Sequence, residues 1–96
     1  MQNIFNSIQS ENEQIRKSSI YFAGFYRLIE TEDTLIEQLK TEQYPEIKIL
    51  SGLALLRMGS DKGMKELQKI CKSENNIKVK RMGYSIHKEY INNKAI

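Results

Sequence analysis

Apolar and small residues recur along the chain with the spacing of an α-helix, and the same spacing occurs three times. Positions separated by 4, 3 and 4 residues lie on one side of a helix that has 3.6 residues per turn. Three such sets begin at equal intervals along the chain: Ile15, Ser19, Phe22 and Tyr26; Ile47, Ser51, Ala54 and Met58; Val79, Gly83, Ile86 and Tyr90. A constant period is typical of repeat proteins. The pattern therefore predicts three copies of one amphipathic helix, each with this side buried.

A shorter amphipathic segment precedes each long one. These segments carry Ile4, Phe5 and Ile8, then Leu35, Ile36 and Leu39, then Leu67, Ile70 and Cys71. Strand-like alternation does not compete with the helical pattern. The sequence thus predicts six helices, at about 2–9, 13–28, 32–41, 45–58, 62–72 and 76–92.

Boundary signals agree with this division. Ser10 to Glu13 has the form of a capping box, in which the two side chains satisfy backbone N–H groups at a helix start. Pro45 suits a first helical position, because its missing N–H costs nothing there. Gly59 follows the second long helix and can adopt the left-handed conformation that ends it.

The second unit resembles a known repeat. Pro45-Glu46-Ile47-Lys48, Ser51-Gly52, Ala54-Leu55 and Met58-Gly59-Ser60-Asp61 are similar to the second helix of a HEAT or armadillo-like repeat of the short bacterial type. The match is partial in the third unit and weakest in the first, where Arg27 stands at the position of Gly59. Tyr44 also replaces the aspartate that the family places between paired helices, so we expect the family's ladder of acid and base between repeats to be absent.

The resemblance implies an all-α fold, an α-α superhelix (solenoid) of about three antiparallel helix pairs. The chain is expected to be one domain, residues 1–96, with units at about 1–30, 31–60 and 61–92 and a short tail at 93–96. Such repeats are general scaffolds, so the resemblance implies little about function.

Composition places the chain among ordinary globular proteins, with 40% hydrophobic and 28% charged residues. No positively charged start with an apolar segment marks a signal peptide, and the longest mostly apolar run, Ile49 to Leu56, is too short to span a membrane. Cys71 is the single cysteine, which excludes an internal disulfide framework. We expect a cytoplasmic protein that does not bind membranes.

The long helices of such a stack line its concave side, so residues beside the buried positions form the candidate contact surface. They include Tyr21, Phe25, Leu50, Leu53, Arg57 and Met82. One interpretation is that these apolar residues are simply packed on both sides of their helices. The other is a groove that binds a helix or peptide of a protein partner, because exposed apolar patches mark binding sites.

Basic residues gather in the last third of the chain. The net charge is +3 overall, but residues 1–60 hold six basic and eight acidic residues, whereas residues 61–96 hold nine and four. Lys78, Lys80, Arg81 and Lys88 form the candidate anion-binding cluster, beside a stripe of Lys62, Lys65, Lys69 and Lys72. The cluster is either a solvated face or a nucleic-acid contact, so nucleic-acid binding is the alternative function.

The sequence carries no signal for catalysis. His87 is the sole histidine, and no nucleophile constellation, phosphate loop or metal-ligand cluster accompanies it. We therefore expect a non-enzymatic interaction scaffold without cofactor or metal. Apolar residues in the terminal helices, such as Phe5 and Ile91, predict either a homo-oligomer through those helices or membership of a longer array.

Overall fold

The computed structural model describes residues 3–94, and over this range the chain is helical without a strand. The elements are α1 (Ile4–Ile8), α2 (Glu13–Phe25), the 3-10 helix η1 (Ile29–Thr31), α3 (Glu32–Thr41), α4 (Pro45–Met58), α5 (Asp61–Ser73) and α6 (Ile77–Lys94). The predicted all-α class is confirmed. None of the helices in the described range is both long enough and apolar enough to cross a membrane.

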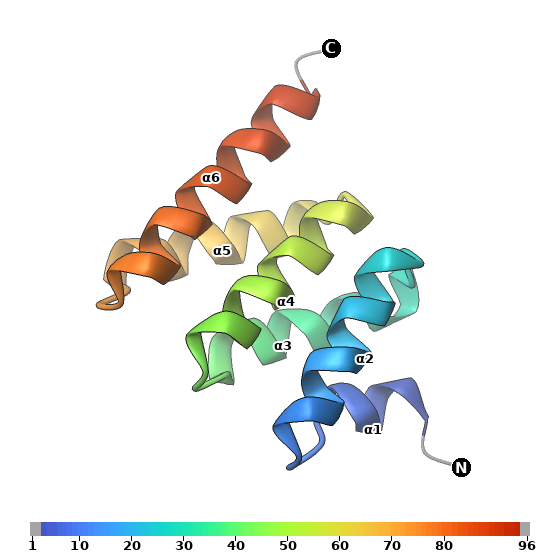
Figure 1. Cartoon of the computed structure of the whole chain (residues 1–96). Helices are drawn as coiled ribbons and strands as arrows, with labels where there is room; N and C mark the ends of the chain where they lie inside the picture. Colours follow the sequence, from blue (N-terminus) through green and yellow to red (C-terminus); the bar gives the residue numbers. More distant parts are fainter. Residues whose placement is uncertain (1–2, 95–96) are drawn as a thin grey trace.

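The helices form two layers (Figure 1). The helices α2, α4 and α6, which correspond to the predicted long helices, lie side by side, so that α4 contacts both α2 and α6. Behind them, α3 contacts both α1 and α5. Each of α1, α3 and α5 also packs against the helix that follows it, α2, α4 and α6 respectively. The body measures 41 × 31 × 16 Å, and its thin dimension fits two layers of helices at the usual interaxial distance of about 10 Å.

The start of α2 differs from the predicted capping box. Asn12 caps the helix, and its side chain accepts hydrogen bonds from the backbone N–H groups of Gln14 and Ile15 at 2.9 and 3.2 Å. Ser10 instead accepts a bond from the N–H of Asn12 at 3.1 Å. The prediction that Ser10 caps α2 was therefore wrong, because Asn12 is the last residue with extended backbone angles and so holds the capping position.

The predicted stop at Gly59 is confirmed, and α2 ends by the same device. Gly59 has φ of 69°, and Arg27, which occupies the equivalent position in the preceding unit, has φ of 51°. In the residue after Gly59, the N–H of Ser60 donates a hydrogen bond to the carbonyl of Leu55 at 3.0 Å. In the residue after Arg27, the N–H of Leu28 donates one to the carbonyl of Ala23 at 2.9 Å. α2 consequently ends at Phe25, three residues before its predicted end, because a left-handed residue interrupts the helix.

The core is built from aliphatic side chains and contains none of the aromatic ones. It is formed by Ile8, Ile20, Ala23, Leu35, Leu39, Ile47, Ala54, Leu55, Met64, Leu67, Cys71 and Ile86. The chain has three Phe and five Tyr. Seven of these aromatic side chains are exposed, and the remaining one, Tyr90, is partly buried.

The predicted buried side of the long helices is confirmed in α4 and α6 but was wrong in α2. Ile47, Ser51, Ala54, Val79, Gly83 and Ile86 are all buried. In contrast, Ile15, Phe22 and Tyr26 are 39%, 49% and 58% exposed. Ala54 of α4 lies against Gly24 of α2, and Ile86 of α6 lies against Gly52 of α4, whereas no long helix precedes α2 in the described range.

Two ion pairs link successive helix pairs at equivalent positions, so the predicted absence of a ladder was wrong. Arg16 of α2 bonds to both carboxylate oxygens of Glu42, through Nε at 2.8 Å and Nη2 at 3.1 Å. Lys48 of α4, the counterpart of Arg16 in the second unit, pairs with Glu74 at 3.0 Å. The acid of each pair thus lies two residues before Tyr44 or its counterpart Asn76, and not at that position itself.

Glu42 is the more enclosed of the two acids, with its side chain 1% exposed. Burial alone would raise the pKa of this carboxyl, but the Arg16 guanidinium, the Tyr44 N–H and the Gln38 amide all donate hydrogen bonds to it. Together these donors hold the pKa of Glu42 below its ordinary value. The pair therefore joins α2 to the turn between α3 and α4 with every carboxylate oxygen bonded.

Candidate interaction groove between α2 and α4

Four of the residues predicted to contact a partner meet at one hollow of about 90 Å³ between α2 and α4. Tyr21, Leu50, Leu53 and Arg57 line it, together with Ile20, Gly24 and Ala54. Leu50 and Leu53 are half-buried, whereas Tyr21 is 52% exposed and Arg57 is exposed. The two helices therefore present an apolar depression with a cation at its rim.

Gly24 allows the helices to approach closely beneath this hollow. A Cβ at Gly24 would lie 2.7 Å from the Cα of Ala54, which is closer than non-bonded carbon atoms approach. With a glycine on α2 and an alanine on α4, the backbones meet while the larger side chains diverge around them. This pair of small residues explains why the surface sinks between Tyr21 and Leu53.

Two further hollows continue along the same helices. One of about 400 Å³ shares Tyr21 and Leu50 with the first and adds Gln14, Lys17, Ser18 and Phe22. The next, of about 450 Å³, is lined by Glu13, Gln14, Lys17, Tyr44, Pro45, Glu46, Ile47, Asn76 and Lys78. Because each shares residues with its neighbour, the three form one depression, which we call the α2–α4 groove.

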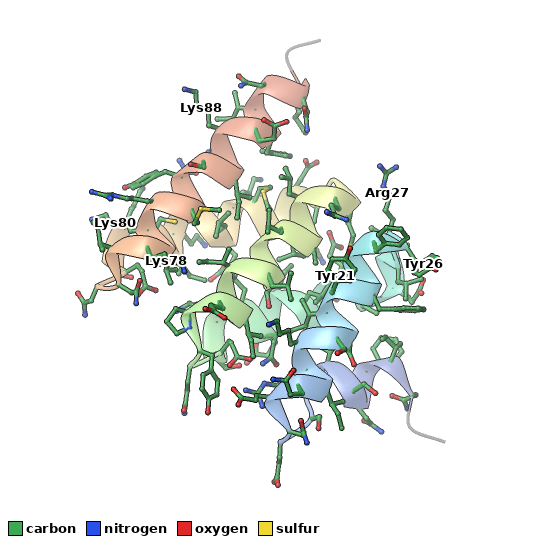
Figure 2. The ribbon with its side chains drawn as sticks, in the orientation of Figure 1. Tyr21, Tyr26, Arg27, Lys78, Lys80 and Lys88 are labelled. Atoms are coloured by element: carbon green, nitrogen blue, oxygen red, sulfur yellow. The ribbon has the colours of Figure 1, made fainter. Side chains whose placement is uncertain are left out.

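Exposed aromatic rings surround the C-terminal end of α2. Tyr21 stacks on Phe25 with 6.0 Å between ring centroids, Phe25 meets Tyr26 edge to face at 5.0 Å, and Tyr26 lies 4.6 Å from Phe22. All four are about half exposed. Figure 2 shows that Tyr26 projects at the outer edge of α2, away from α4. The aromatic cluster therefore runs from the groove to the end of the molecule.

The groove carries cations without carboxylate partners. Arg57 lies over the ring of Tyr21, 5.9 Å from its centroid, which is within the range of a cation–π contact. Lys17 lines the middle of the groove and Lys78 its far end. Within residues 3–94, none of these three side chains forms an ion pair.

The remaining predicted contact residues lie outside the groove. Phe25 stacks on Tyr21 but lines none of the hollows, and Met82, 37% exposed, belongs to α6. Conversely, Phe22 and Lys17 line the groove and were not predicted to do so. The helical period assigned Phe22 to the buried side, but within residues 3–94 no long helix packs on the outer side of α2 to cover it.

The predicted basic cluster divides around α6 (Figure 2). Lys78 lies on the side toward α4, whereas Lys80 and Lys88 project on the side away from it. Arg81 and Lys88 are seven residues apart and so share one helix side. In the adjoining α5 stripe, Lys62 donates to Asp33 at 2.7 Å. These residues therefore form two separate basic regions.

The described part of the chain holds no group of three or more His, Cys, Asp or Glu side chains that could bind a metal ion. His87 is partly buried with Tyr90 as its aromatic neighbour at 6.0 Å, and burial raises the pKa of the Cys71 thiol. Comparisons with protein-family models, with curated proteins and with solved structures find no match to this chain.

Proposed function

We propose that this protein is a non-enzymatic interaction scaffold whose α2–α4 groove binds a helix or peptide of a protein partner. The observation that carries the proposal is the sorting of its apolar side chains. The core is aliphatic, while four half-exposed aromatic residues cluster around the C-terminal end of α2, and two of them, Tyr21 and Phe22, line the groove. Aromatic residues are enriched at protein interfaces, where they contribute most of the binding energy.

The proposal includes a HEAT-like superhelix as the scaffold, working in the cytoplasm. The recurrence of equivalent contacts in successive units supports this architecture. Arg16–Glu42 and Lys48–Glu74 are one example, and the left-handed residues Arg27 and Gly59 are another. The cytoplasmic location is supported by the cysteine count, since a fold stabilised by internal disulfides needs at least two cysteines and this chain has one.

The groove indicates the chemistry of the partner. The hollow between Tyr21 and Leu53 measures about 90 Å³. It is smaller than a cavity of about 150 Å³ that holds benzene, so it suits one aliphatic side chain. Lys17, Arg57 and Lys78 would pair with carboxylates at the edges of the groove. The partner we propose is therefore an amphipathic segment with an aliphatic anchor and acidic flanks.

Affinity capture from a lysate of the source organism tests this function with three forms of the chain. The wild type should retain a partner that the double variant Tyr21→Glu, Leu53→Glu loses, because two carboxylates would be desolvated at the apolar centre of the groove. Tyr84→Glu, on α6, is the matched control and should retain the partner. Retention of the same partner by the double variant would contradict the proposal.

Salt dependence separates this function from nucleic-acid binding. A partner held by an apolar groove should survive an increase in salt concentration, whereas phosphate contacts weaken steeply. The double substitution Arg81→Gln, Lys88→Gln should leave capture of the protein partner unchanged. Retention of nucleic acid that is lost in salt and in this variant would instead favour the alternative function.

A further inference from the structure

The outer side of α2 has the same register as the sides of α4 and α6 that are covered. Ala54 of α4 lies against Gly24 of α2, and Ile86 of α6 lies against Gly52 of α4, 3.4 Å from where its Cβ would stand. Phe22 is the counterpart of Ala54 in α2 and is 49% exposed. α2 therefore presents the surface that its two counterparts use to contact a neighbouring long helix.

The outer side of α6 presents the complementary register. Gly52 is the residue of α4 that Ile86 of α6 packs against. Its counterpart in α6 is Tyr84, which is 53% exposed. Ile77 and Ile91 lie seven residues to either side of Tyr84, on the same side of the helix, and are 61% and 52% exposed. The exposed apolar residues of α6 thus mark where a following long helix would pack.

The series of ion pairs between successive helix pairs stops before α6 within the described residues. Arg16 pairs with Glu42 and Lys48 with Glu74, whereas Lys80, the next base in the series, forms no ion pair within residues 3–94. Near it, Arg81 and Lys88 add positive charge to the outer side of α6. The only charged residues among 3–15 are acidic, Glu11 and Glu13. These two carboxylates lie just before α2 and at its first residue, and Arg16, which follows them, is already paired with Glu42.

We propose that copies of this chain associate head to tail, with the α2 side of one copy packed on the outer side of α6 of the next. Phe22, Tyr26 and Ile15 would cover Ile77, Tyr84 and Ile91, in the register by which α6 packs on α4. The inference does not depend on a partner in the α2–α4 groove, because, of these three residues on the α2 side, only Phe22 also lines the groove, and Tyr21, Leu50 and Leu53 take no part.

The exposed area indicates a weak contact. Half-exposed aromatic and large aliphatic side chains each leave on the order of 100 Å² in solvent, so three per surface bury on the order of 300 Å². That is well below the roughly 800 Å² per partner of a stable interface, even before polar residues at the rim are added. The association should therefore appear between about 10 µM and 1 mM. A head-to-tail contact also leaves a free surface at each end, so longer chains form at higher concentration.

Sedimentation velocity over this concentration range tests the proposal with two single-surface variants. Phe22→Glu removes the α2 surface and Tyr84→Glu the α6 surface; both residues are half exposed, and far-UV circular dichroism verifies that each variant is folded. The mean sedimentation coefficient of the wild type should increase with protein concentration, and each variant alone should associate at least tenfold more weakly. An equimolar mixture of the two should recover dimers but no longer species, because each variant contributes one intact surface.

Three results would overturn the proposal. One is a wild type that stays monomeric up to about 1 mM. Another is a mixture of the variants that forms no dimers. The third is association that only Phe22→Glu abolishes, since this would indicate symmetric pairing of two α2 surfaces. The groove variant Tyr21→Glu should assemble like the wild type, so that failure of this proposal and failure of groove binding can be told apart.

Discussion

Arg27 adopts a backbone conformation that glycine adopts more readily. Its φ of 51° closes α2, and the equivalent residue that closes α4 is Gly59. In the left-handed region, the Cβ of a residue other than glycine crowds the following carbonyl oxygen. The price of ending α2 with arginine is a locally strained residue on an otherwise ordinary helix end.

Arg27→Gly is therefore expected to stabilise the protein. Removal of the strain outweighs the greater chain entropy of glycine in the unfolded state, so the gain should be about 0.5–1 kcal/mol. Urea denaturation followed by far-UV circular dichroism measures it. Gly59→Ala is the converse variant and should lose a similar amount; equal stability of wild type and Arg27→Gly would show that the position is not strained.

Glu42→Gln should destabilise the protein at neutral pH. The amide preserves the shape of the side chain but leaves the Arg16 guanidinium, which is 12% exposed, without its counter-ion. Loss of one member of a buried pair costs about 3–5 kcal/mol, and partial exposure of Arg16 reduces the expected loss to about 2–3 kcal/mol. Glu74→Gln, in the more exposed pair with Lys48, should cost about 1 kcal/mol or less. Equal losses in the two variants would contradict this ranking.

At the scale of helices, small residues determine how closely neighbours approach. Gly24 meets the backbone of Ala54, which cannot move without displacing α4. Gly52 lies in the contact between α4 and α6, but an added Cβ there would meet only the ends of the Ile86 and Leu67 side chains, at 3.4 and 3.5 Å. The two glycines thus have different roles although each lies between long helices.

Gly24→Ala is expected to destabilise by about 1–3 kcal/mol, because the methyl group forces α2 away from α4. Gly52→Ala should be neutral or stabilising by up to about 1 kcal/mol, since alanine favours the helix and the neighbouring side chains have room. Urea denaturation of both variants provides the comparison. A similar loss in both would show that the approach of α2 to α4 is not limited by Gly24.

At the scale of the whole molecule, acid should weaken several ion pairs between helices together. The pKa of Glu74 is lowered, mainly by the N–H of Asn76 and then by Lys48, and that of Asp61 is lowered by Lys94 and Tyr90. Glu42 shifts in the same direction. A carboxyl with a lowered pKa in the folded state stabilises that state above its ordinary pKa and loses this contribution as the pH falls through the folded-state value.

The free energy of unfolding should therefore be nearly constant from neutral pH down to about 4.5, the ordinary pKa of Glu42, and fall below it. Denaturant titrations at a series of pH values measure this profile. Glu42→Gln should show a shallower decline, because one of the responsible carboxyls is gone. A wild-type profile that is flat below pH 4.5 would mean that these ion pairs contribute nothing to folding.

The number, order and approximate bounds of the helices could be predicted because they follow from local features: the apolar period, Pro45 and Gly59. The exposure of Phe22 could not be predicted, since Phe22 and Ala54 occupy the same position in their repeat units. They differ because Ala54 packs against α2. The ladder was missed for a related reason. Glu42 and Arg16 are 26 residues apart and meet only once the helices are packed. The helical period also predicted that Tyr21 and Leu53 share one surface, but it did not show that Met82 lies outside the α2–α4 groove.

The aliphatic core has a practical consequence for spectroscopy. The chain contains no tryptophan, and its tyrosines lie at the groove, at the two ends of the molecule or near its surface. Tyrosine fluorescence should consequently change little when the interior melts, yet respond when a ligand or another copy covers Tyr21, Tyr26 or Tyr84. In this protein the intrinsic chromophores are reporters of association rather than of folding.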